Sequence, residues 1–188
     1  FKGSETEKNL LKSFAGESQA RNRYTFFAKV ARKEGYVQIA NIFTETAFNE
    51  EQHAKQMFKF LEGGDLEITA TYPAGRIGTT MENLTAAAMG ENEEWSMLYP
   101  EFAKVAKEEG FDEISRFYTN LAKVEAEHEA RYLKLKKNLE QEIVFHRDEK
   151  VRWKCNNCGF IAEAMDAPQL CPVCAHPQAH FSLMVEDY

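Results

Sequence analysis

The chain has 188 residues, a formal net charge of −7 at pH 7 and 44% hydrophobic residues. This length accommodates one substantial core with a small appended module, and so acidic a chain lacks the concentrated basic face that binds nucleic acid. No apolar run approaches the roughly 18 residues of a membrane span, and the polar start FKGSETEK does not resemble a signal peptide. The sequence therefore predicts a folded cytoplasmic protein that has neither nucleic acid nor a membrane as its partner.

Four long helices are predicted along the first 140 residues. Capping boxes, Ser4 with Glu7 and Thr79 with Glu82, open the first and third helices. Glycines mark several of the ends, and the predicted bounds are Ser4 to Gly35, Tyr36 to Glu62, Thr79 to Gly110 and Phe111 to Leu139. The connection between the second and third helices is much longer than the other two, which favours a crossover between two antiparallel hairpins. The pattern predicts a mainly α fold, a four-helix bundle with ferritin-like topology.

The two halves of this bundle repeat one another. Phe27–Gly35 reads FAKVARKEG and Phe102–Gly110 reads FAKVAKEEG. Fifteen residues after each terminal glycine stands a Glu-x-x-His motif, and an additional glutamate precedes each copy within an Ala-Gly-Glu or Met-Gly-Glu segment. The duplicated residues are Glu17, Glu50 and His53 in the first half, and Glu91, Glu125 and His128 in the second. A single Glu-x-x-His would be a weak signal, whereas its repetition predicts a metal site.

Each repeated acid lies on the apolar face of its predicted helix, where residues recur at helical spacing. The predicted inward positions are Leu10, Phe14, Tyr24, Ala28 and Ala31 on the first helix, Ile39, Ile42, Phe43, Thr46, Met57 and Leu61 on the second, Leu84, Ala88, Trp95 and Leu98 on the third, and Ile114, Phe117, Leu121, Val124, Leu135 and Leu139 on the fourth. A buried carboxylate without a counter-charge costs several kcal/mol. The part of the bundle where these glutamates meet must therefore contain cations.

The ligand set indicates two metal ions. Imidazole together with bridging carboxylates suits iron or manganese, and iron is favoured where redox chemistry is intended. The expected roles are Glu50 and Glu125 as bridging ligands, Glu17 and Glu91 as terminal ligands, His128 on one ion and His53 at or near the other.

Helix three departs from the repeat in two ways. The offset between the copies is 74 residues at Glu17 and Glu91 but 75 from Tyr24 and Tyr99 onward, so one residue is inserted, which predicts a π-bulge. Glu94 lies one turn after Glu91 and has no acidic counterpart in the first half, so it is a seventh candidate ligand. We expect Glu94 to bind the ferric state and His53 the ferrous state of one ion, which keeps the buried charge near zero.

Other polar residues receive simpler assignments. Tyr24 and Tyr99 match across the repeat, and either packing or hydrogen bonds to the ligand carboxylates explains them. His146, His176 and His180 lie outside the repeated motifs and are interpreted as structural or exposed.

The pattern changes near residue 145, which predicts a bundle domain over residues 1–145 and a second domain over residues 146–188. Two short strands, 143–145 and 151–153, are expected on either side of a charged turn. The four cysteines follow as two C-x-x-C knuckles, Cys155 with Cys158 and Cys171 with Cys174. This clustering predicts a four-thiolate metal site rather than disulfides, and the cysteine spacing is compatible with both zinc and iron. Trp153, Phe160 and Phe181 are expected around it, either shielding the metal or forming the small core.

With these motifs assembled, the whole chain resembles the rubrerythrin family. The resemblance rests on GESQARNRY, GENEE, the two Glu-x-x-His motifs, and the CNNCG and CPVCA knuckles. It implies a di-iron centre in a ferritin-like bundle, iron in a small β-rich rubredoxin-like domain, and the Glu94/His53 exchange. It also implies a homodimer in which the cysteine domain of one subunit serves the di-iron site of the other.

The function that this resemblance implies is the reduction of hydrogen peroxide to water, protecting the cell against oxidative stress. Electrons would reach the di-iron site through the rubredoxin-like iron from rubredoxin or an NAD(P)H-dependent reductase. The catalytic candidates are Glu94, His53, Tyr24 and Tyr99, the last two and Glu94 as proton relays. Two alternatives stay open: a ferroxidase or iron-storage protein, which the bundle alone would support, and a structural zinc ribbon used for partner binding.

Overall fold

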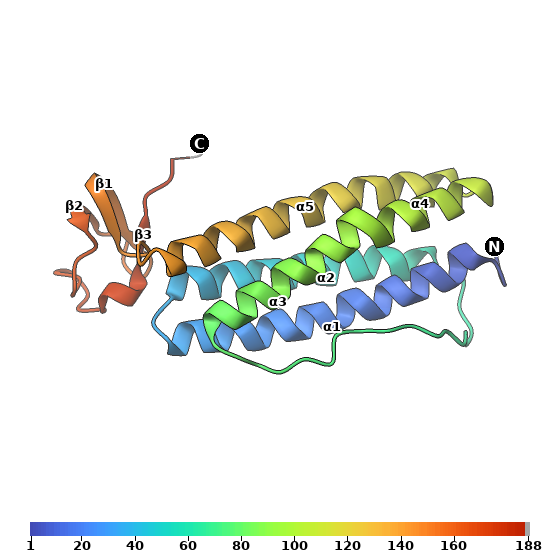
Figure 1. Cartoon of the computed structure of the whole chain (residues 1–188), viewed down its shortest axis with the longest axis horizontal. Helices are drawn as coiled ribbons and strands as arrows, with labels where there is room; N and C mark the ends of the chain where they lie inside the picture. Colours follow the sequence, from blue (N-terminus) through green and yellow to red (C-terminus); the bar gives the residue numbers. More distant parts are fainter. Residues whose placement is uncertain (187–188) are drawn as a thin grey trace.

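The computed structural model describes residues 1–186. Its elements in chain order are α1 (Glu5–Lys33), α2 (Val37–Phe60), α3 (Thr80–Glu93), the π-helical turn η1 (Glu94–Leu98), α4 (Tyr99–Glu108), α5 (Asp112–Glu140), β1 (His146–Cys155), β2 (Ile161–Asp166), the 3₁₀ turn η2 (Gln178–His180) and β3 (Phe181–Leu183). α3, η1 and α4 run on as one rod, so four rods form the bundle, and the small sheet lies at one end of it (Figure 1). The predicted four-helix bundle is confirmed.

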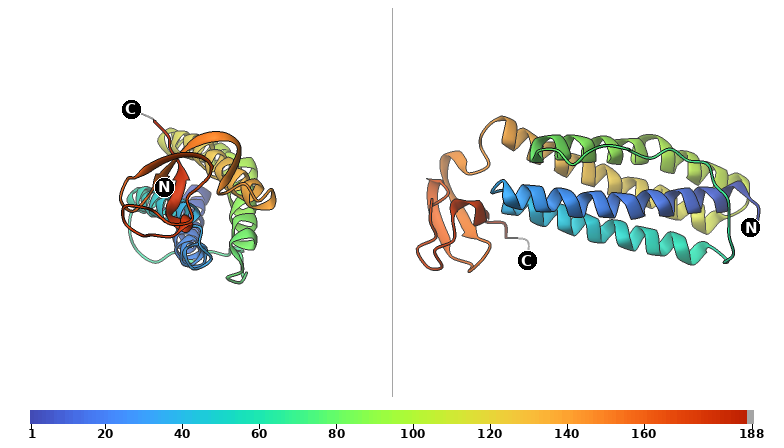
Figure 2. Two further views of the ribbon diagram at one scale, coloured as in Figure 1. Left: turned by 90° about the vertical axis from the view of Figure 1, so that its left-hand side faces the viewer. Right: turned by 90° about the horizontal axis from the view of Figure 1, so that it is seen from below.

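The segment 61–79 between α2 and α3 is a crossover connection, as predicted. It runs along the outside of the bundle from one end to the other (Figures 1 and 2). α1 therefore pairs with α2 as one antiparallel hairpin, and the α3–α4 rod pairs with α5 as the second. This arrangement packs the two hairpins side by side, so that glutamates from both halves of the repeat can meet inside the bundle.

Glycine ends the first helix of each hairpin. Gly35 and Gly110 have φ angles of +89° and +84°, a left-handed conformation that costs glycine little. After each glycine, the next amide closes the helix end: the N–H of Tyr36 donates to the carbonyl of Ala31 at 2.8 Å, and Phe111 does the same to Ala106 at 2.8 Å. These tight ends produce the short joints that the sequence indicated.

The residue before each of these glycines caps a helix of the other half. Glu34 accepts a hydrogen bond from the backbone N–H of Thr80 at 3.0 Å. Glu109 accepts from the N–H groups of Glu5 at 3.0 Å and Thr6 at 2.8 Å. Carboxylates at these positions satisfy free amide donors and complement the positive end of the helix dipole. These reciprocal caps fasten the two hairpins together at both ends of the bundle.

Two apolar clusters fill the bundle, one on either side of the layer of glutamates. One contains Tyr24, Phe27, Phe43, Leu84 and Tyr132 among its buried residues. The other contains Leu10, Met57, Tyr99, Tyr118 and Leu121. Along every rod a residue of one cluster precedes the glutamate and a residue of the other follows it, so the acids occupy a polar layer within a dry interior. The inward positions predicted from periodicity are largely confirmed.

Val124 is an exception, because 39% of its surface is exposed. It precedes Glu125 on α5, and one residue of helix turns the side chain by about 100°, enough to move it from the core to the edge of the bundle.

The C-terminal module is a three-stranded antiparallel sheet in the order β2-β1-β3. The strand predicted at 151–153 is confirmed as part of β1. The strand predicted at 143–145 and the charged turn were wrong, because residues 143–145 are not a strand and β1 is continuous across the charged stretch. His146 pairs with Asp166 and Val151 with Ala164, so β1 has extra residues between two pairings that are close together on β2. A bulge absorbs these charged residues at the surface, which lets the strand continue.

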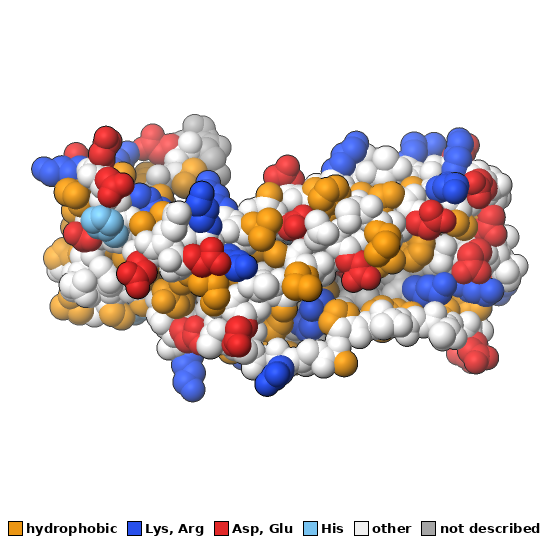
Figure 3. Space-filling model, viewed as in Figure 1, with side chains coloured by type: hydrophobic (Ala, Val, Ile, Leu, Met, Phe, Trp, Pro, Cys, Tyr) orange, Lys and Arg blue, Asp and Glu red, His pale blue; other side chains and the backbone are white. Residues whose placement is uncertain are grey.

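Acidic and basic side chains are intermixed on the face shown in Figure 3. Among residues 1–186, the structure contains no helix that has both the length and the apolar character needed to cross a membrane.

Candidate metal centre

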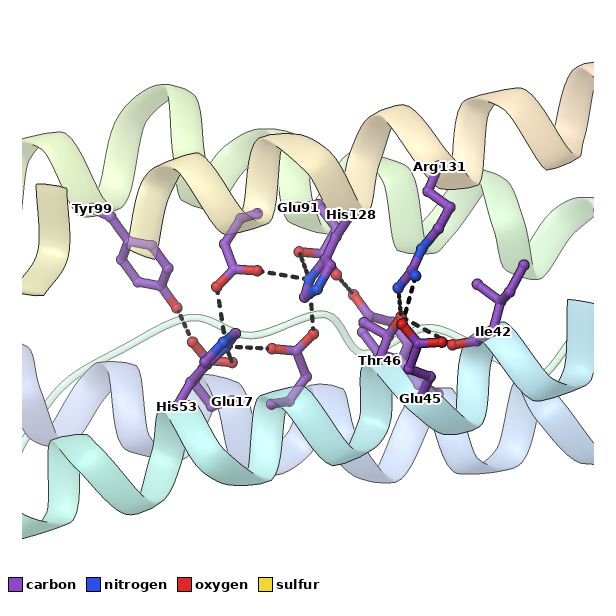
Figure 4. A network of polar contacts seen from close by, with 12 residues as sticks. Glu17, Ile42, Glu45, Thr46, His53, Glu91, Tyr99, His128 and Arg131 are labelled. Atoms are coloured by element: carbon purple, nitrogen blue, oxygen red, sulfur yellow. Dashed lines mark hydrogen bonds and ion pairs between the residues drawn. The ribbon is translucent and has the colours of Figure 1, made fainter. Parts of the chain in front are cut away.

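Four glutamates, one from each rod, meet in the polar layer of the bundle. They are Glu17 on α1, Glu50 on α2, Glu91 on α3 and Glu125 on α5, and at most 1% of each is exposed. Glu17 and Glu91 point toward the labelled histidines from separate helices in Figure 4. Burial of four acids at one level is unfavourable unless they are paired with positive charge.

His53 and His128 supply the nitrogen atoms of this layer. Each lies three residues after a glutamate, so the helix places the pair on one face. His53 Nδ1 lies 2.9 Å from Glu50, 3.2 Å from Glu125 and 3.7 Å from Glu17. His128 Nδ1 lies 2.8 Å from Glu125, 3.4 Å from Glu50 and 3.6 Å from Glu91. Both imidazoles therefore turn the same nitrogen toward the carboxylates.

These six residues form two overlapping groups of ligands. One group contains Glu17, Glu50, His53 and Glu125, the other Glu50, Glu91, Glu125 and His128, and in each group one ligand atom per residue lies within 4.8 Å of all the others. Glu50 and Glu125 belong to both. Two ions held by these groups would share both carboxylates, which is the arrangement that bridging ligands produce.

Several candidate ligand atoms in this layer lie close to one another without forming a hydrogen bond, which supports a fit to metal ions. Among residues 1–186, the buried atoms without a hydrogen bond include one carboxylate oxygen each of Glu17, Glu50 and Glu91, both of Glu125, and His128 Nδ1. Buried polar atoms are nearly always satisfied in native proteins. Carboxylate and imidazole atoms left free toward a common centre are the donor set of an iron site.

Protonation equilibria show how strongly the layer requires positive charge. Burial and the charge of Glu50 raise the pKa of Glu17 well above its usual value, and burial with the charge of Glu50 raises the pKa of Glu91 to about 8. Burial also opposes ionisation of Glu50, but hydrogen bonds with His128 and His53 outweigh it and lower the pKa of Glu50 to about 2.

The histidines respond in the opposite sense. Burial disfavours the imidazolium of His128, yet contacts with Glu125, Glu50 and Glu91 raise its pKa to about 12. Burial also disfavours the imidazolium of His53, but contacts with Glu125, Glu17 and Glu50 outweigh it and raise the pKa of His53. The metal-free layer thus retains protons as its counter-charge, and metal ions must displace them on binding.

Two tyrosines each hydrogen-bond a glutamate from the opposite half of the repeat. These glutamates, Glu17 and Glu91, each belong to only one of the two ligand groups and are called the outer glutamates. Tyr24 donates its phenolic hydrogen to Glu91 at 2.5 Å, and Tyr99 donates to Glu17 at 2.5 Å. Both rings are almost fully buried, at 1% and 2% exposure. Burial, followed by the charges of Glu91 and Glu17 respectively, raises both pKa values well above the usual range. The two phenols therefore stay protonated and orient these carboxylates.

The predicted π-bulge is confirmed as η1. The N–H of Tyr99 donates to the carbonyl of Glu94, five residues back, which accommodates the inserted residue. Without this wider turn, Tyr99 would be rotated by about 100° relative to its repeat partner and would not reach Glu17.

Glu94, at the start of η1, lies outside both ligand groups. It is half-buried, and it lines a cavity together with Tyr99 and Gly16. Burial and the nearby charges of Glu17 and Glu91 raise its pKa well above the usual value. The structure thus brings six of the seven candidate ligands together, and coordination by Glu94 remains a prediction.

Two groups of contacts near the site were not predicted, one at Glu129 and one at Arg131. Trp95 Nε1 donates to Glu129 at 2.5 Å, and Asn92 donates to the same carboxylate at 3.1 Å. On the α2 side, Arg131 contacts Glu45 at 2.7 Å and Thr46 at 3.0 Å (Figure 4). Glu129 corresponds to an alanine in the first half, so the repetition that identified the ligands carried no signal for it.

The four cysteines are free and converge as the second candidate site. Their sulfur atoms lie within 4.8 Å of one another, with 3.7 Å between Cys155 and Cys174 and 3.6 Å between Cys158 and Cys171. A tetrahedral ion with metal–sulfur bonds of about 2.3 Å separates its ligands by about 3.8 Å, so the group fits such an ion.

Residues after the second cysteine of each knuckle adopt left-handed backbone conformations. Gly159 has φ +82° and Ala175 has φ +55°. Their N–H groups donate to the carbonyls of Cys155 and Cys171, each at 2.9 Å, which closes both knuckles. Trp153 and Phe181 are buried in the core of this module.

The three remaining histidines lie outside the ligand groups described for residues 1–186. His146 contacts Asp166 at 2.7 Å, and His176 and His180 pack edge to face with their ring centres 4.5 Å apart.

Comparisons with known proteins agree with this geometry. The rubrerythrin family model matches residues 8–136, and the model of the rubrerythrin rubredoxin-like domain matches residues 153–182. Rubrerythrin from Porphyromonas gingivalis is 62% identical over 188 residues, covering 100% of this chain and 94% of that protein. Rubrerythrin from Nitratidesulfovibrio vulgaris is 54% identical over 184 residues, covering 98% and 96%.

Solved structures extend the likeness. The fully reduced, all-ferrous state of nigerythrin has a TM-score of 0.65 at 32% identity, covering 97% of this chain and 87% of that one. A bacterioferritin from Desulfovibrio desulfuricans with a di-iron site has a TM-score of 0.63 at 21% identity, covering 74% and 82%, which shows the shared ferritin-like fold. The chain therefore belongs to the rubrerythrin family, with a di-iron site of carboxylate and histidine ligands in its bundle and a four-cysteine rubredoxin-like knuckle at its C-terminal end.

Proposed function

We propose that the protein is a peroxidase that reduces hydrogen peroxide to water, with the balance H₂O₂ + 2 H⁺ + 2 e⁻ → 2 H₂O, and so protects the cell against oxidative stress. The observation that carries this proposal is the presence of both sites in one chain: two overlapping carboxylate–imidazole groups and one four-thiolate group. When bound, a pair of iron ions supplies the two electrons that the O–O bond takes up as it breaks. Iron storage alone would need no thiolate site.

The six converging residues are proposed to hold the two ions, with the carboxylates that both groups share as the bridges. Glu94 and His53 are proposed to alternate as ligands of one ion. His53 is favoured for this exchange because its side chain retains 15% exposure, against 6% for His128, and therefore has more room to move.

The chain's own residues are proposed to supply and retain the protons. Tyr24 and Tyr99 keep a proton on the phenolic oxygen and hold it 2.5 Å from a carboxylate of the site. Glu94 lines the adjoining cavity beside Tyr99, where it can pass a proton inward from water.

A homodimer is proposed to complete the electron path. From Glu125 to the end of α5 at Glu140, a rise of 1.5 Å per residue gives about 22 Å, and the cysteine module lies beyond that end (Figure 1). Electron transfer over such a span is slow, whereas a second copy packed head to tail would place its thiolate site beside the bundle. Rubredoxin or an NAD(P)H-dependent reductase is the proposed donor. Free cysteines suit a reducing compartment such as the cytoplasm.

One experiment tests the reaction. The iron-loaded protein is reduced without oxygen, mixed with one equivalent of hydrogen peroxide, and the oxidation of the di-iron site is followed by absorbance in a stopped-flow instrument. The same reduced protein is mixed with dioxygen. Faster oxidation by peroxide supports the peroxidase, whereas faster oxidation by dioxygen supports a ferroxidase, the alternative that the bundle alone would support.

Metal analysis separates the remaining alternative. Three irons per chain are expected, two in the bundle and one at the four cysteines. Zinc at the cysteines would remove the proposed electron path and favour a structural ribbon that binds a partner.

A further inference from the structure

A cavity of about 360 Å³ lies between α1, the α3–α4 rod and the crossover segment. Glu94, Leu98 and Tyr99 form its inner wall, next to the metal centre, and residues 70–73 cover it from outside. The crossover segment lies against α1 along this edge of the molecule in Figures 1 and 2. On this side of the bundle, the cavity therefore lies between the metal centre and the crossover segment.

Two glycines open the floor of this cavity toward the ligands. Gly16 and Gly90 occupy matching positions in the repeat, and each immediately precedes a terminal glutamate, Glu17 or Glu91. A Cβ atom at Gly16 would lie 3.6 Å from the ring of Tyr72, and one at Gly90 would lie 3.6 Å from the guanidinium of Arg23. Because neither position carries a side chain, the cavity reaches the helix backbone directly beside the two acids.

Tyr72 closes the outer side. Its hydroxyl donates to the backbone carbonyl of Lys12 at 2.7 Å, which ties the crossover segment to α1. About a third of the residue is exposed, so its ring lies between solvent and the cavity. The wall is apolar at Leu98 and Phe102 and polar at Glu94 and Arg23, whose Nε lacks a hydrogen-bond partner among residues 1–186.

We propose that this cavity is the access chamber of the di-iron site, and that Tyr72 limits its use to hydrogen peroxide and short alkyl hydroperoxides. The chamber could hold about twelve water-sized molecules, since one water takes up about 30 Å³ of liquid, so its volume alone does not exclude larger peroxides. The ring of Tyr72 over Gly16 sets the limit. The selectivity for peroxide rests on the proposed function, whereas the route itself does not.

The route is tested with azide, a small anion that binds ferric iron, added to the oxidised iron-loaded protein and followed by stopped-flow absorbance. Gly16→Val fills the floor under Tyr72, and we expect its association and dissociation rates to fall together by about tenfold with unchanged affinity, because a passage affects both directions equally. An altered affinity with an unchanged association rate would mean that the substitution only disturbs Glu17, and it would overturn the proposal.

A matched control blocks the opposite face. His128 borders a shallow groove that Val124 also lines, so small molecules have a second possible approach there. Val124→Trp covers that groove from an exposed position and should leave azide association unchanged. Slower association in this variant, with normal rates in Gly16→Val, would place the route at His128 and reject the chamber.

The size limit is tested at Tyr72, which is exposed enough to be replaced without unfolding the bundle. Turnover of cumene hydroperoxide relative to hydrogen peroxide should rise by about tenfold in Tyr72→Ala and much less in Tyr72→Phe, which keeps the ring and loses only the hydrogen bond to Lys12. Equal selectivity in all three proteins would refute the role of Tyr72. If no protein reduced peroxide, the proposed function would fail, and the azide kinetics would still decide the route.

Discussion

Tyr99 donates a 2.5 Å hydrogen bond to Glu17, a residue of the opposite half of the repeat, and the wide turn of η1 absorbs the one-residue insertion so that the ring still reaches it. Tyr24 makes the same contact with Glu91 in the other direction. The two outer carboxylates of the metal centre are therefore each held by a helix of the other hairpin.

Removing one phenol tests this relationship. Tyr99→Phe should fold, bind iron and lose roughly 10- to 100-fold in peroxidase rate or iron affinity, as substitutions behind metal ligands commonly do. Tyr24→Phe is the matched variant, and equal losses would indicate that the two phenols act alike. Steady-state turnover and iron titration measure both quantities. A Tyr99→Phe protein with wild-type values would show that the ring only packs.

The metal-free protein should lose stability as the pH rises from about 5 to about 8. The pKa of Glu91 is about 8 in the folded protein and about 4.5 in the unfolded chain. Between these two values the folded state binds more protons than the unfolded state, so the free energy of unfolding falls as the pH rises. His128 contributes in the same sense above its unfolded value of 6.5, because its folded pKa is about 12. Urea unfolding after iron chelation measures the trend.

Below about pH 4.5 the sign reverses. The pKa of Glu50 falls to about 2 in the folded protein, so its stabilisation is present above 4.5 and is lost as the pH falls toward 2. Glu91→Gln removes one titrating group and should flatten the decline between pH 5 and 8. Iron-loaded protein should instead gain stability with rising pH, because protons compete with the metal; a decline like that of the metal-free protein would contradict this account.

The cysteine module should depend on its metal for folding. Its apolar core contains few fully buried residues, among them Trp153 and Phe181, too few to stabilise so small a sheet alone. A structural metal contributes on the order of 10 kcal/mol of binding free energy in small domains. Chelation should therefore unfold β1–β3 and leave the helices intact. Trp153 fluorescence and limited proteolysis report this, and a protease-resistant module without metal would contradict it.

Ala175 offers a stability test within that module. Its φ of +55° is unfavourable for any residue with a Cβ atom, whereas the equivalent position in the other knuckle is already Gly159. Ala175→Gly should raise the free energy of unfolding of the metal-loaded module by about 1 kcal/mol. Gly159→Ala is the opposite change and should lower it. Thermal unfolding monitored at Trp153 distinguishes the two.

Electron delivery between subunits is tested by complementation. Glu50→Gln disables the bundle site of one copy, and Cys158→Ser disables the thiolate site of another. Mixed at equal amounts and allowed to exchange, they should recover about a quarter of the wild-type turnover, because half of the dimers are mixed and each contains one competent pair. If electrons pass only within one chain, neither variant rescues the other and the mixture stays inactive.

The convergence of six candidate ligands could be predicted from the sequence because the repeat marks them twice. Glu50 and Glu125 stand at one offset, each with its histidine, and the change of offset at Glu91 located η1. Helical periodicity then placed most core residues. These features depend on local spacing, which the sequence carries directly.

Contacts that depend on how the helices pack could not be obtained this way. The pairing of Trp95 with Glu129 has no repeated signal, and the exposure of Val124 depends on where the edge of α5 lies. The continuity of β1 through its charged residues follows from the bulge opposite β2. The chamber under Tyr72 requires knowing where an irregular segment of the crossover comes to rest.

The reciprocal caps of Glu34 and Glu109 have a consequence for how such a protein can be built. Two identical hairpins, associating side by side, would already contain both caps, both tyrosine contacts and all six ligands that converge on the centre. Their site would be symmetric, and its two ions equivalent. One inserted residue at η1 together with Glu94 breaks that equivalence, so a fused chain gains what a dimer of halves cannot have: two ions with different surroundings.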